Sequence, residues 1–118
     1  MTTDKLIYEV IGACFEVYNT LGPGLLESVY EKALVHECRL RGLNVKSQIP
    51  VEIVYKSAVV GDDLRLDLLV EDKLVIELKS VESYFKQIRT YMRLLNKSVG
   101  LLVNFDVSDF KQGYRVVK

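Results

Sequence analysis

Two short apolar runs, joined by three polar residues, constrain the fold of this chain most strongly. Residues 64–70 and 74–78 are rich in Leu, Val and Ile, and Glu71-Asp72-Lys73 separates them. This pattern is typical of two strands connected by a tight turn. If the three polar residues form the turn, Val70 lies opposite Leu74. A slip of one residue would mix charged and apolar side chains on both faces, so this register is favoured.

In this register one face of the hairpin is apolar and the other carries charges. The apolar face consists of Leu64, Leu66, Leu68, Val70, Leu74, Ile76 and Leu78. On the other face Asp67 lies opposite Glu77, and Arg65 lies opposite Lys79. Opposed Cβ atoms are about 4.5–5.5 Å apart, so the two carboxylates are neighbours and repel each other. A divalent cation such as Mg²⁺ would offset that repulsion, while a solvated sheet face is the alternative.

The apolar spacing also predicts the other elements. Helices are expected over residues 5–19, 25–41 and 82–96, and strands over 45–55, 64–70, 74–78 and 99–105, with 114–117 as a candidate edge strand. Asp4 is the expected N-cap of the first helix, and Gly61-Asp62-Asp63 is an expected turn. The expected core positions of the second helix are Leu26, Val29, Ala33, Leu34 and Leu40. The order predicts a mixed α/β fold with an antiparallel three-stranded meander and a parallel crossover.

Length and charge limit the classes of function. The 118 residues fit a single domain, residues 1–118. The 16 basic and 16 acidic residues cancel, which excludes a chain that coats nucleic acid by bulk charge. A local basic edge remains, since Lys79, Lys86, Arg89, Arg93 and Lys97 are opposed by Glu82 alone. No apolar run reaches the ~18–20 residues that span a bilayer, and no secretory signal is evident. A cytoplasmic protein without membrane contact is therefore expected.

Cysteine and histidine usage narrows the metal chemistry. Cys14 and Cys38 have apolar neighbours and are expected as buried free thiols. His36 is expected on a helix surface. One histidine and two distant cysteines give no zinc-ligand spacing, so any metal would bind oxygen atoms.

Several motifs together resemble a known superfamily. Asp67…Glu77-Leu78-Lys79 on a hairpin resembles the PD-(D/E)XK nuclease superfamily, and Gln87-Ile88-Arg89-Thr90-Tyr91 resembles the Q-x-x-x-Y element of its RecB-like branch. The segment Gly24-Leu25-Leu26-Glu27-Ser28-Val29-Tyr30 is similar to the signature of the GxxExxY protein family within that superfamily.

The resemblance implies a fold and an activity. The fold would be a restriction-endonuclease-like α-β-β-β-α-β core with an extra N-terminal helix, and the reaction Mg²⁺- or Mn²⁺-dependent hydrolysis of DNA phosphodiester bonds without an organic cofactor. The implied metal ligands are Asp67, Glu77, the backbone carbonyl of Leu78, and Glu27. The implied catalytic residues are Asp67, Glu77, Lys79, Gln87, Glu27 and Tyr91. From the residues alone, Glu27 also suits a helix N-terminus and Tyr30 also suits a core position.

Two further hypotheses stand beside this one. The segment from Lys79 to Gln87 is shorter than in family members, which favours a catalytically inactive nuclease-fold module that binds nucleic acid or a protein. The first helix is apolar over more than half of its surface, which predicts a homodimer. Its apolar residues are Leu6, Ile7, Val10, Ile11, Phe15 and Tyr18.

Overall fold

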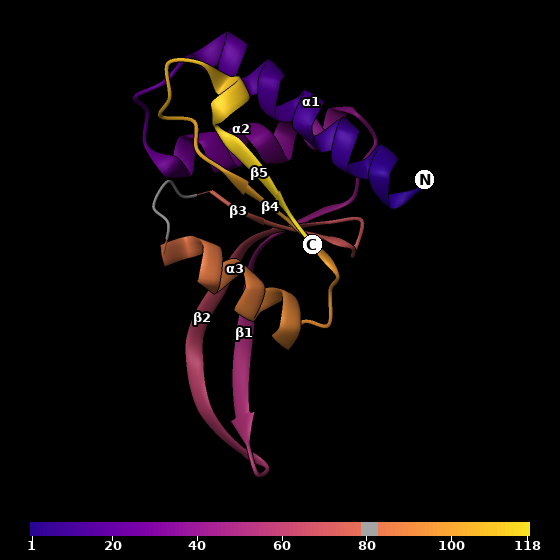
Figure 1. Cartoon of the computed structure of the whole chain (residues 1–118), viewed down its shortest axis with the longest axis vertical. Coiled ribbons are helices and arrows are strands. Elements are labelled where there is room, and N and C mark those ends of the chain that lie inside the picture. Colours follow the sequence, from indigo (N-terminus) through magenta and orange to yellow (C-terminus); the bar gives the residue numbers. More distant parts are fainter. Residues whose placement is uncertain (79–82) are drawn as a thin grey trace.

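A central five-stranded sheet separates two helical layers in the computed structural model (Figure 1). The structure describes residues 1–78 and 83–118, and the side chains of all of these except 83–86. The elements are α1 (Thr3–Leu21), α2 (Glu27–Leu40), β1 (Val45–Tyr55), β2 (Ala58–Val70), β3 (Leu74–Glu77), α3 (Ser83–Leu94), β4 (Val99–Val103), the 3₁₀ helix η1 (Phe110–Gln112) and β5 (Tyr114–Val117).

The observed topology confirms the predicted fold class. Strands β1, β2 and β3 form an antiparallel meander, β4 pairs with β3 in parallel, and β5 adds an antiparallel edge. From α2 to β4 the order is α-β-β-β-α-β, and α1 is the extra N-terminal helix. The crossover between β3 and β4 contains α3, as parallel neighbours require.

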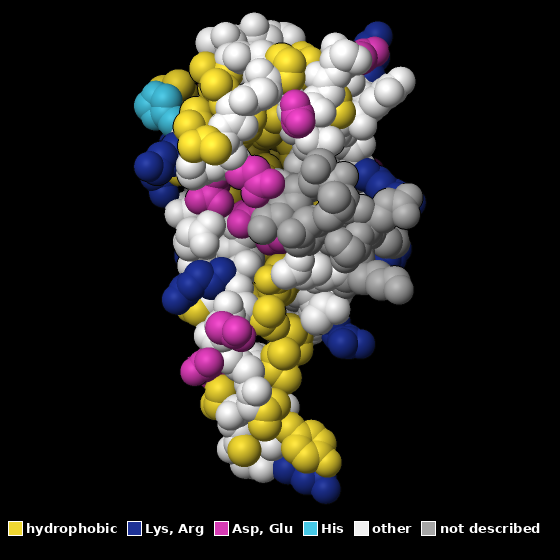
Figure 2. Space-filling model, turned by 90° about the vertical axis from the view of Figure 1, so that its left-hand side faces the viewer, with side chains coloured by type: hydrophobic (Ala, Val, Ile, Leu, Met, Phe, Trp, Pro, Cys, Tyr) yellow, Lys and Arg dark blue, Asp and Glu magenta, His cyan; other side chains and the backbone are white. Residues whose placement is uncertain are grey.

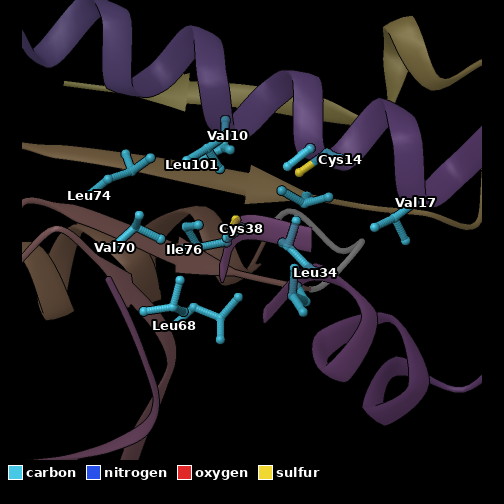
Figure 3. Packing of buried hydrophobic residues seen from close by; sticks show 14 of the residues in the cluster. Val10, Cys14, Val17, Leu34, Cys38, Leu68, Val70, Leu74, Ile76 and Leu101 are labelled. Carbon is cyan, nitrogen blue, oxygen red and sulfur yellow. The ribbon is translucent and has the colours of Figure 1, made fainter. Parts of the chain in front are cut away.

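Each face of the sheet has its own hydrophobic core. Helices α1 and α2 cover one face through residues such as Val10, Leu34 and Cys38, which pack on Leu68 and Leu101 (Figure 3). Helix α3 covers the other face. Its buried residues Ile88, Tyr91 and Met92 pack on strand residues Val51, Leu66, Leu69 and Val75.

The β2–β3 hairpin has the predicted register. Leu68 pairs with Ile76, Leu69 with Val75, and Val70 with Leu74. Glu71 and Asp72 form the turn with φ of 53° and 55°, and the amide of Lys73 donates to the Val70 carbonyl at 3.0 Å. The hairpin therefore carries Asp67 and Glu77 toward the same place on the sheet.

The expected face of Leu64 and Leu66 is wrong. Both pack in the core beneath α3, whereas Leu68 packs in the core beneath α1 and α2. The side chains change faces at Asp67. In the β1–β2 ladder Ser47 pairs with Leu68 and Ile49 with Leu66, while Gln48 and Asp67, which lie between these pairs, are not paired. Gln48 has φ of 52°, so the pleat is interrupted there and strict alternation does not continue across it.

The expected turn at Gly61–Asp63 is also wrong. Those residues lie inside β2, and the chain reverses at Lys56 and Ser57, whose φ angles are 47° and 70°. Gly61 pairs with Ile53 beside a register shift. The result is a long β1–β2 arm that projects from the body of the molecule (Figure 1).

Helix boundaries and core positions need smaller corrections. Thr2, not Asp4, caps α1, because its hydroxyl accepts from the Lys5 amide at 3.2 Å. In α2 the buried residues are Tyr30, Leu34 and Cys38, spaced four apart, while the expected core residues Leu26, Val29 and Leu40 are exposed. Strand β2 begins at Ala58, six residues before the predicted start at residue 64. The other predicted bounds agree within two residues, although residue 82 lies outside the described part of the chain.

Apolar side chains of α1 that extend beyond its core-facing side are covered by other parts of the same chain. Phe15 makes edge contacts with Phe110 and Tyr114, and the Tyr18 ring packs on Phe110. The hydroxyl of Tyr18 donates to the Val107 carbonyl. The surface on which the homodimer prediction rested is therefore occupied by the C-terminal segment, and the oligomeric state stays a prediction.

The single-residue expectations for cysteine and histidine are confirmed. Cys14 and Cys38 are free and buried, and burial raises the pKa of both thiols. His36 is exposed on α2. The two thiols are thus protonated core residues at neutral pH.

Tyr30 fastens the loop between α1 and α2. Its ring stacks on Phe105 with centroids 4.5 Å apart. Its hydroxyl donates to the Gly22 carbonyl at 2.5 Å and accepts from the Leu25 amide at 3.1 Å. The core position considered for Tyr30 is the one observed, with a hydroxyl that orders the residues leading into α2.

We expect Tyr30→Phe to lower the free energy of unfolding by about 1 kcal/mol, because the stack remains while both hydrogen bonds are lost. Urea unfolding measures this, with Tyr8→Phe as the control, since Tyr8 is 75% exposed. Equal losses in the two variants would contradict the assigned role.

Candidate functional site

The site begins where β2 and β3 separate. Their ladder ends at Leu68 and Ile76, and the next residues exchange side-chain hydrogen bonds across the gap. The Asp67 amide donates to Glu77 Oε1 at 3.0 Å, and the Leu78 amide donates to Asp67 Oδ2 at 2.9 Å. Each carboxylate is therefore fixed by a backbone amide of the opposite segment, and the predicted juxtaposition of the two acids is observed.

Glu77 is the buried acid of the pair. Its side chain is 2% exposed, and it is the one charged residue in the buried set of the described chain. Burial makes a carboxylate costly, and the neighbouring charge of Asp67 adds repulsion. A cation bound between them would lower both costs. Asp67 is half-buried, so this position is reached from solvent.

Helix α3 brings two more predicted residues to this place. Gln87 Nε2 donates to the Tyr91 hydroxyl at 2.9 Å, and Tyr91 is buried in the core beneath α3. Burial raises the pKa of Tyr91, and the charges of Glu77 and Asp67 raise it further, while hydrogen bonds with Gln87 and the Arg65 backbone oppose the shift. The Tyr91 hydroxyl is therefore a neutral group in the field of both carboxylates.

Glu27 lies at the rim of the site. It is exposed in the first turn of α2 and lines a cavity of about 190 Å³ together with Leu78, Asn104 and Asp106. In the described part of the chain, no three His, Cys, Asp or Glu residues are placed to hold one metal ion. The expected role of Glu27 as a third carboxylate ligand beside Asp67 and Glu77 stays a prediction.

Glu31 is a site residue that the sequence reasoning missed. It lies one helical turn after Glu27 and accepts a hydrogen bond from Gln48 Nε2 at 2.7 Å. Burial raises the pKa of Glu31, the bond from Gln48 opposes this, and the charges of Asp67 and Glu27 raise the pKa further. The i, i+4 spacing from Glu27 was the available signal. Acidic side chains gather on this face of the molecule (Figure 2).

The predicted basic edge is described only in part. Lys79 and Glu82 lie outside the described residues, as does the side chain of Lys86. Lys97 pairs with Asp72 at 3.3 Å, and Arg89 donates to the Lys118 carbonyl at 3.2 Å. Arg93 is exposed on α3.

Comparison with known proteins assigns the family. The sequence pattern of the PD-(D/E)XK nuclease superfamily matches residues 4–117, so the chain belongs to this superfamily. No curated protein and no solved structure was found to match the chain. The resemblance of Gly24–Tyr30 to the GxxExxY signature stays a prediction. In the described residues, no helix has the length and apolarity to cross a membrane.

The raised pKa of Glu31 yields a pH-dependent prediction. An acid whose pKa is raised by folding favours the native state while protonated, and this contribution is lost as pH rises through the folded pKa. Glu31→Gln keeps an acceptor for Gln48 and removes the charge. We expect the melting temperature of Glu31→Gln at pH 7 to exceed that of the wild type by about 2 °C. The substitution removes a charge that is partly buried and is repelled by Asp67 and Glu27, and the effect is small because the side chain is partly exposed.

Thermal unfolding between pH 3.5 and 7 measures the difference. It should shrink toward zero as pH falls below about 4, where both proteins carry a neutral side chain. Glu52→Gln, an exposed acid on β1, is the matched control. A pH-independent difference would contradict the assigned electrostatic cause.

Proposed function

We propose that this protein is a single-domain nuclease, residues 1–118, that hydrolyses DNA phosphodiester bonds with Mg²⁺ or Mn²⁺. The observation that carries the proposal is the reciprocal pair of hydrogen bonds that holds Asp67 and Glu77 side by side. Membership of the PD-(D/E)XK nuclease superfamily supports a nuclease-like function that acts on nucleic acid. We also propose that the protein acts as a homodimer.

The donor set fits a hard divalent cation. Asp67 and Glu77 offer carboxylate oxygens, and the Leu78 carbonyl is a third oxygen next to them in sequence. Mg²⁺ is held in many sites by one or two carboxylates, with waters and substrate oxygens completing an octahedron. Two carboxylates therefore suffice, and Glu27 need not be a direct ligand. When bound, the cation supplies Lewis-acid polarisation of a phosphate oxygen and makes a bound water more acidic.

The chain's own residues orient and stabilise the reaction. The amide of Leu78 holds the Asp67 carboxylate in place, and the amide of Asp67 holds that of Glu77. Lys79 lies two residues after Glu77 in the sequence. We assign it to orienting the attacking water and to stabilising the negative charge that develops on the phosphate. Gln87 and Tyr91 form a hydrogen-bonded unit beside the pair that would orient water or phosphate. Glu27 would contribute a further carboxylate at the rim of the site.

A second candidate is a nuclease-fold module without turnover. The short segment between Lys79 and Gln87 favours it. Such a module would bind nucleic acid or a protein through the same face and would not cleave. Binding without cleavage across several metals and substrates separates it from the nuclease.

Asp67→Asn tests the carboxylate pair with little change in shape, because the amide oxygen can still accept from Leu78. We expect cleavage of duplex and single-stranded DNA to fall at least about 100-fold and Mn²⁺ binding by calorimetry to be lost, since a charged ligand is removed. Asp63→Asn is the control, because Asp63 is an exposed acid on the same strand. Unchanged Mn²⁺ affinity in Asp67→Asn would overturn the site.

Lys79→Ala separates catalysis from binding. We expect a fall of about 10²–10³-fold in the cleavage rate with Mn²⁺ affinity retained, because the lysine stabilises charge and is not a ligand. Lys73→Ala, in the exposed β2–β3 turn, should match the wild type. Equal residual activity in wild type, Asp67→Asn and Lys79→Ala would indicate a contaminant.

Glu27→Gln should give a smaller effect than Asp67→Asn. We expect Mn²⁺ affinity to change by less than about tenfold, because Glu27 lies at the rim of the site while Asp67 and Glu77 keep their charges. Calorimetry on both variants measures the contrast. Equal losses in the two variants would show that Glu27 is a ligand after all.

A further inference from the structure

The distal part of the β1–β2 arm carries a group of exposed hydrophobic side chains beside one turn. Val54, Tyr55, Val59 and Val60 are 54–62% exposed, and they lie on both sides of the Lys56-Ser57 turn. Figure 2 shows the apolar side chains running along the arm to its tip. The base of the arm is different, since Val51 and Leu66 are buried beneath α3. Apolar surface of this kind marks an interaction site.

The arm also offers an open strand edge. Strand β3 pairs with β2 only from Leu68 to Val70, so within the described chain the stretch Ala58–Leu66 has a strand partner on one side alone. Tyr55 and Ala58 flank the two-residue turn as a hydrogen-bonded pair, which directs the N–H and C=O of Val59 to the open edge. The register shift between Ile53 and Val54 interrupts this edge at Val60, so the regular open edge next to the turn is the short stretch Ala58–Val60, which can pair with another short strand. The outer edge of β1 is less suitable, because Pro50 there has no N–H.

The charge pattern of the arm indicates which partner fits. Lys56 precedes the apolar pair Val59-Val60, and Asp62 and Asp63 follow it. Residues 51–65 hold three acidic and two basic side chains, so the arm does not attract phosphate. Along the chain a basic residue comes first, an apolar pair second and acidic residues last. When two copies of such a segment run antiparallel, the basic end of each lies beside the acidic end of the other. A second copy of this chain therefore satisfies both the charges and the open edge.

We propose that two copies of the chain associate by antiparallel pairing of the open β2 edges at the tips of their arms. In the register that sets Val59 opposite its own counterpart, Lys56 in the turn of one copy comes to the level of Asp62 of the other. Val54 and Val59 are paired within each arm, so the four valines form one continuous apolar row across the joined sheet. The interface is isologous, as a two-fold dimer requires. It does not depend on the proposed nuclease activity.

Introduced cysteines test the register directly. Cys14 and Cys38 are buried, so a single exposed cysteine is the reactive thiol. We expect Val59→Cys to form a disulfide-linked dimer under mild oxidation, since hydrogen-bonded antiparallel partners have Cα atoms about 5.5 Å apart. Val54→Cys, equally exposed on the same arm, should stay unlinked because two strands separate its copies. Linkage at Val54 without linkage at Val59 would overturn the proposed register.

Sedimentation tests the association without a covalent bond. We expect the wild type to pass from 13.5 kDa to twice that mass with rising concentration. Val54→Thr/Val59→Thr keeps β-branched side chains and should weaken association at least about tenfold, whereas Val116→Thr on β5 should not. Lys56→Glu should also weaken it, and adding Asp62→Lys and Asp63→Lys should restore it. A wild type that stays monomeric at every concentration would overturn the proposal.

Discussion

The exchange of hydrogen bonds between Asp67, Glu77 and Leu78 is the constraint on which the site depends. At this point β2 and β3 stop forming a regular ladder, and two backbone amides turn to carboxylates instead of carbonyls. The geometry keeps two negative charges together at the edge of a hydrophobic core. Such an arrangement is stable only while the surroundings supply compensating charge or hydrogen bonds. The same hydrogen bonds that end the β2–β3 ladder therefore hold the carboxylates that the proposed chemistry requires.

Elements on both faces of the sheet position side chains near Asp67 and Glu77. Helix α3 places Tyr91 in the field of the Asp67 and Glu77 carboxylates and packs on Leu69 and Val75. On the other side, the Tyr30 hydroxyl orders the loop from which α2 begins, and that helix presents Glu27 and Glu31 toward the same region. The interruption at Gln48 links the two sides, since the same residue breaks the pleat opposite Asp67 and donates to Glu31.

The sequence predicted the features that follow from regular patterns. The β2–β3 register follows from matching apolar residues, and the meeting of Asp67 and Glu77 follows from the register. The face of Leu66 could not be predicted, because alternation assumes an unbroken pleat and the positive φ of Gln48 has no marker in the sequence. The turn at Lys56-Ser57 was hidden by the stronger turn signal of Gly61-Asp62-Asp63. Glu31 was overlooked because its importance comes from Gln48 and Asp67, which are distant in sequence.

Crystals of the protein soaked in Mn²⁺ test whether Asp67 and Glu77 hold a divalent cation, since Mn²⁺ is located by its anomalous scattering. We predict one strong peak between the carboxylates of Asp67 and Glu77, at oxygen-ligand distances of about 2 Å, with Leu78 as the nearest backbone carbonyl. The same peak should vanish in Asp67→Asn and persist in Asp63→Asn. An empty site between the two carboxylates at saturating Mn²⁺, with their hydrogen bonds to the backbone unchanged, would contradict the proposed metal site.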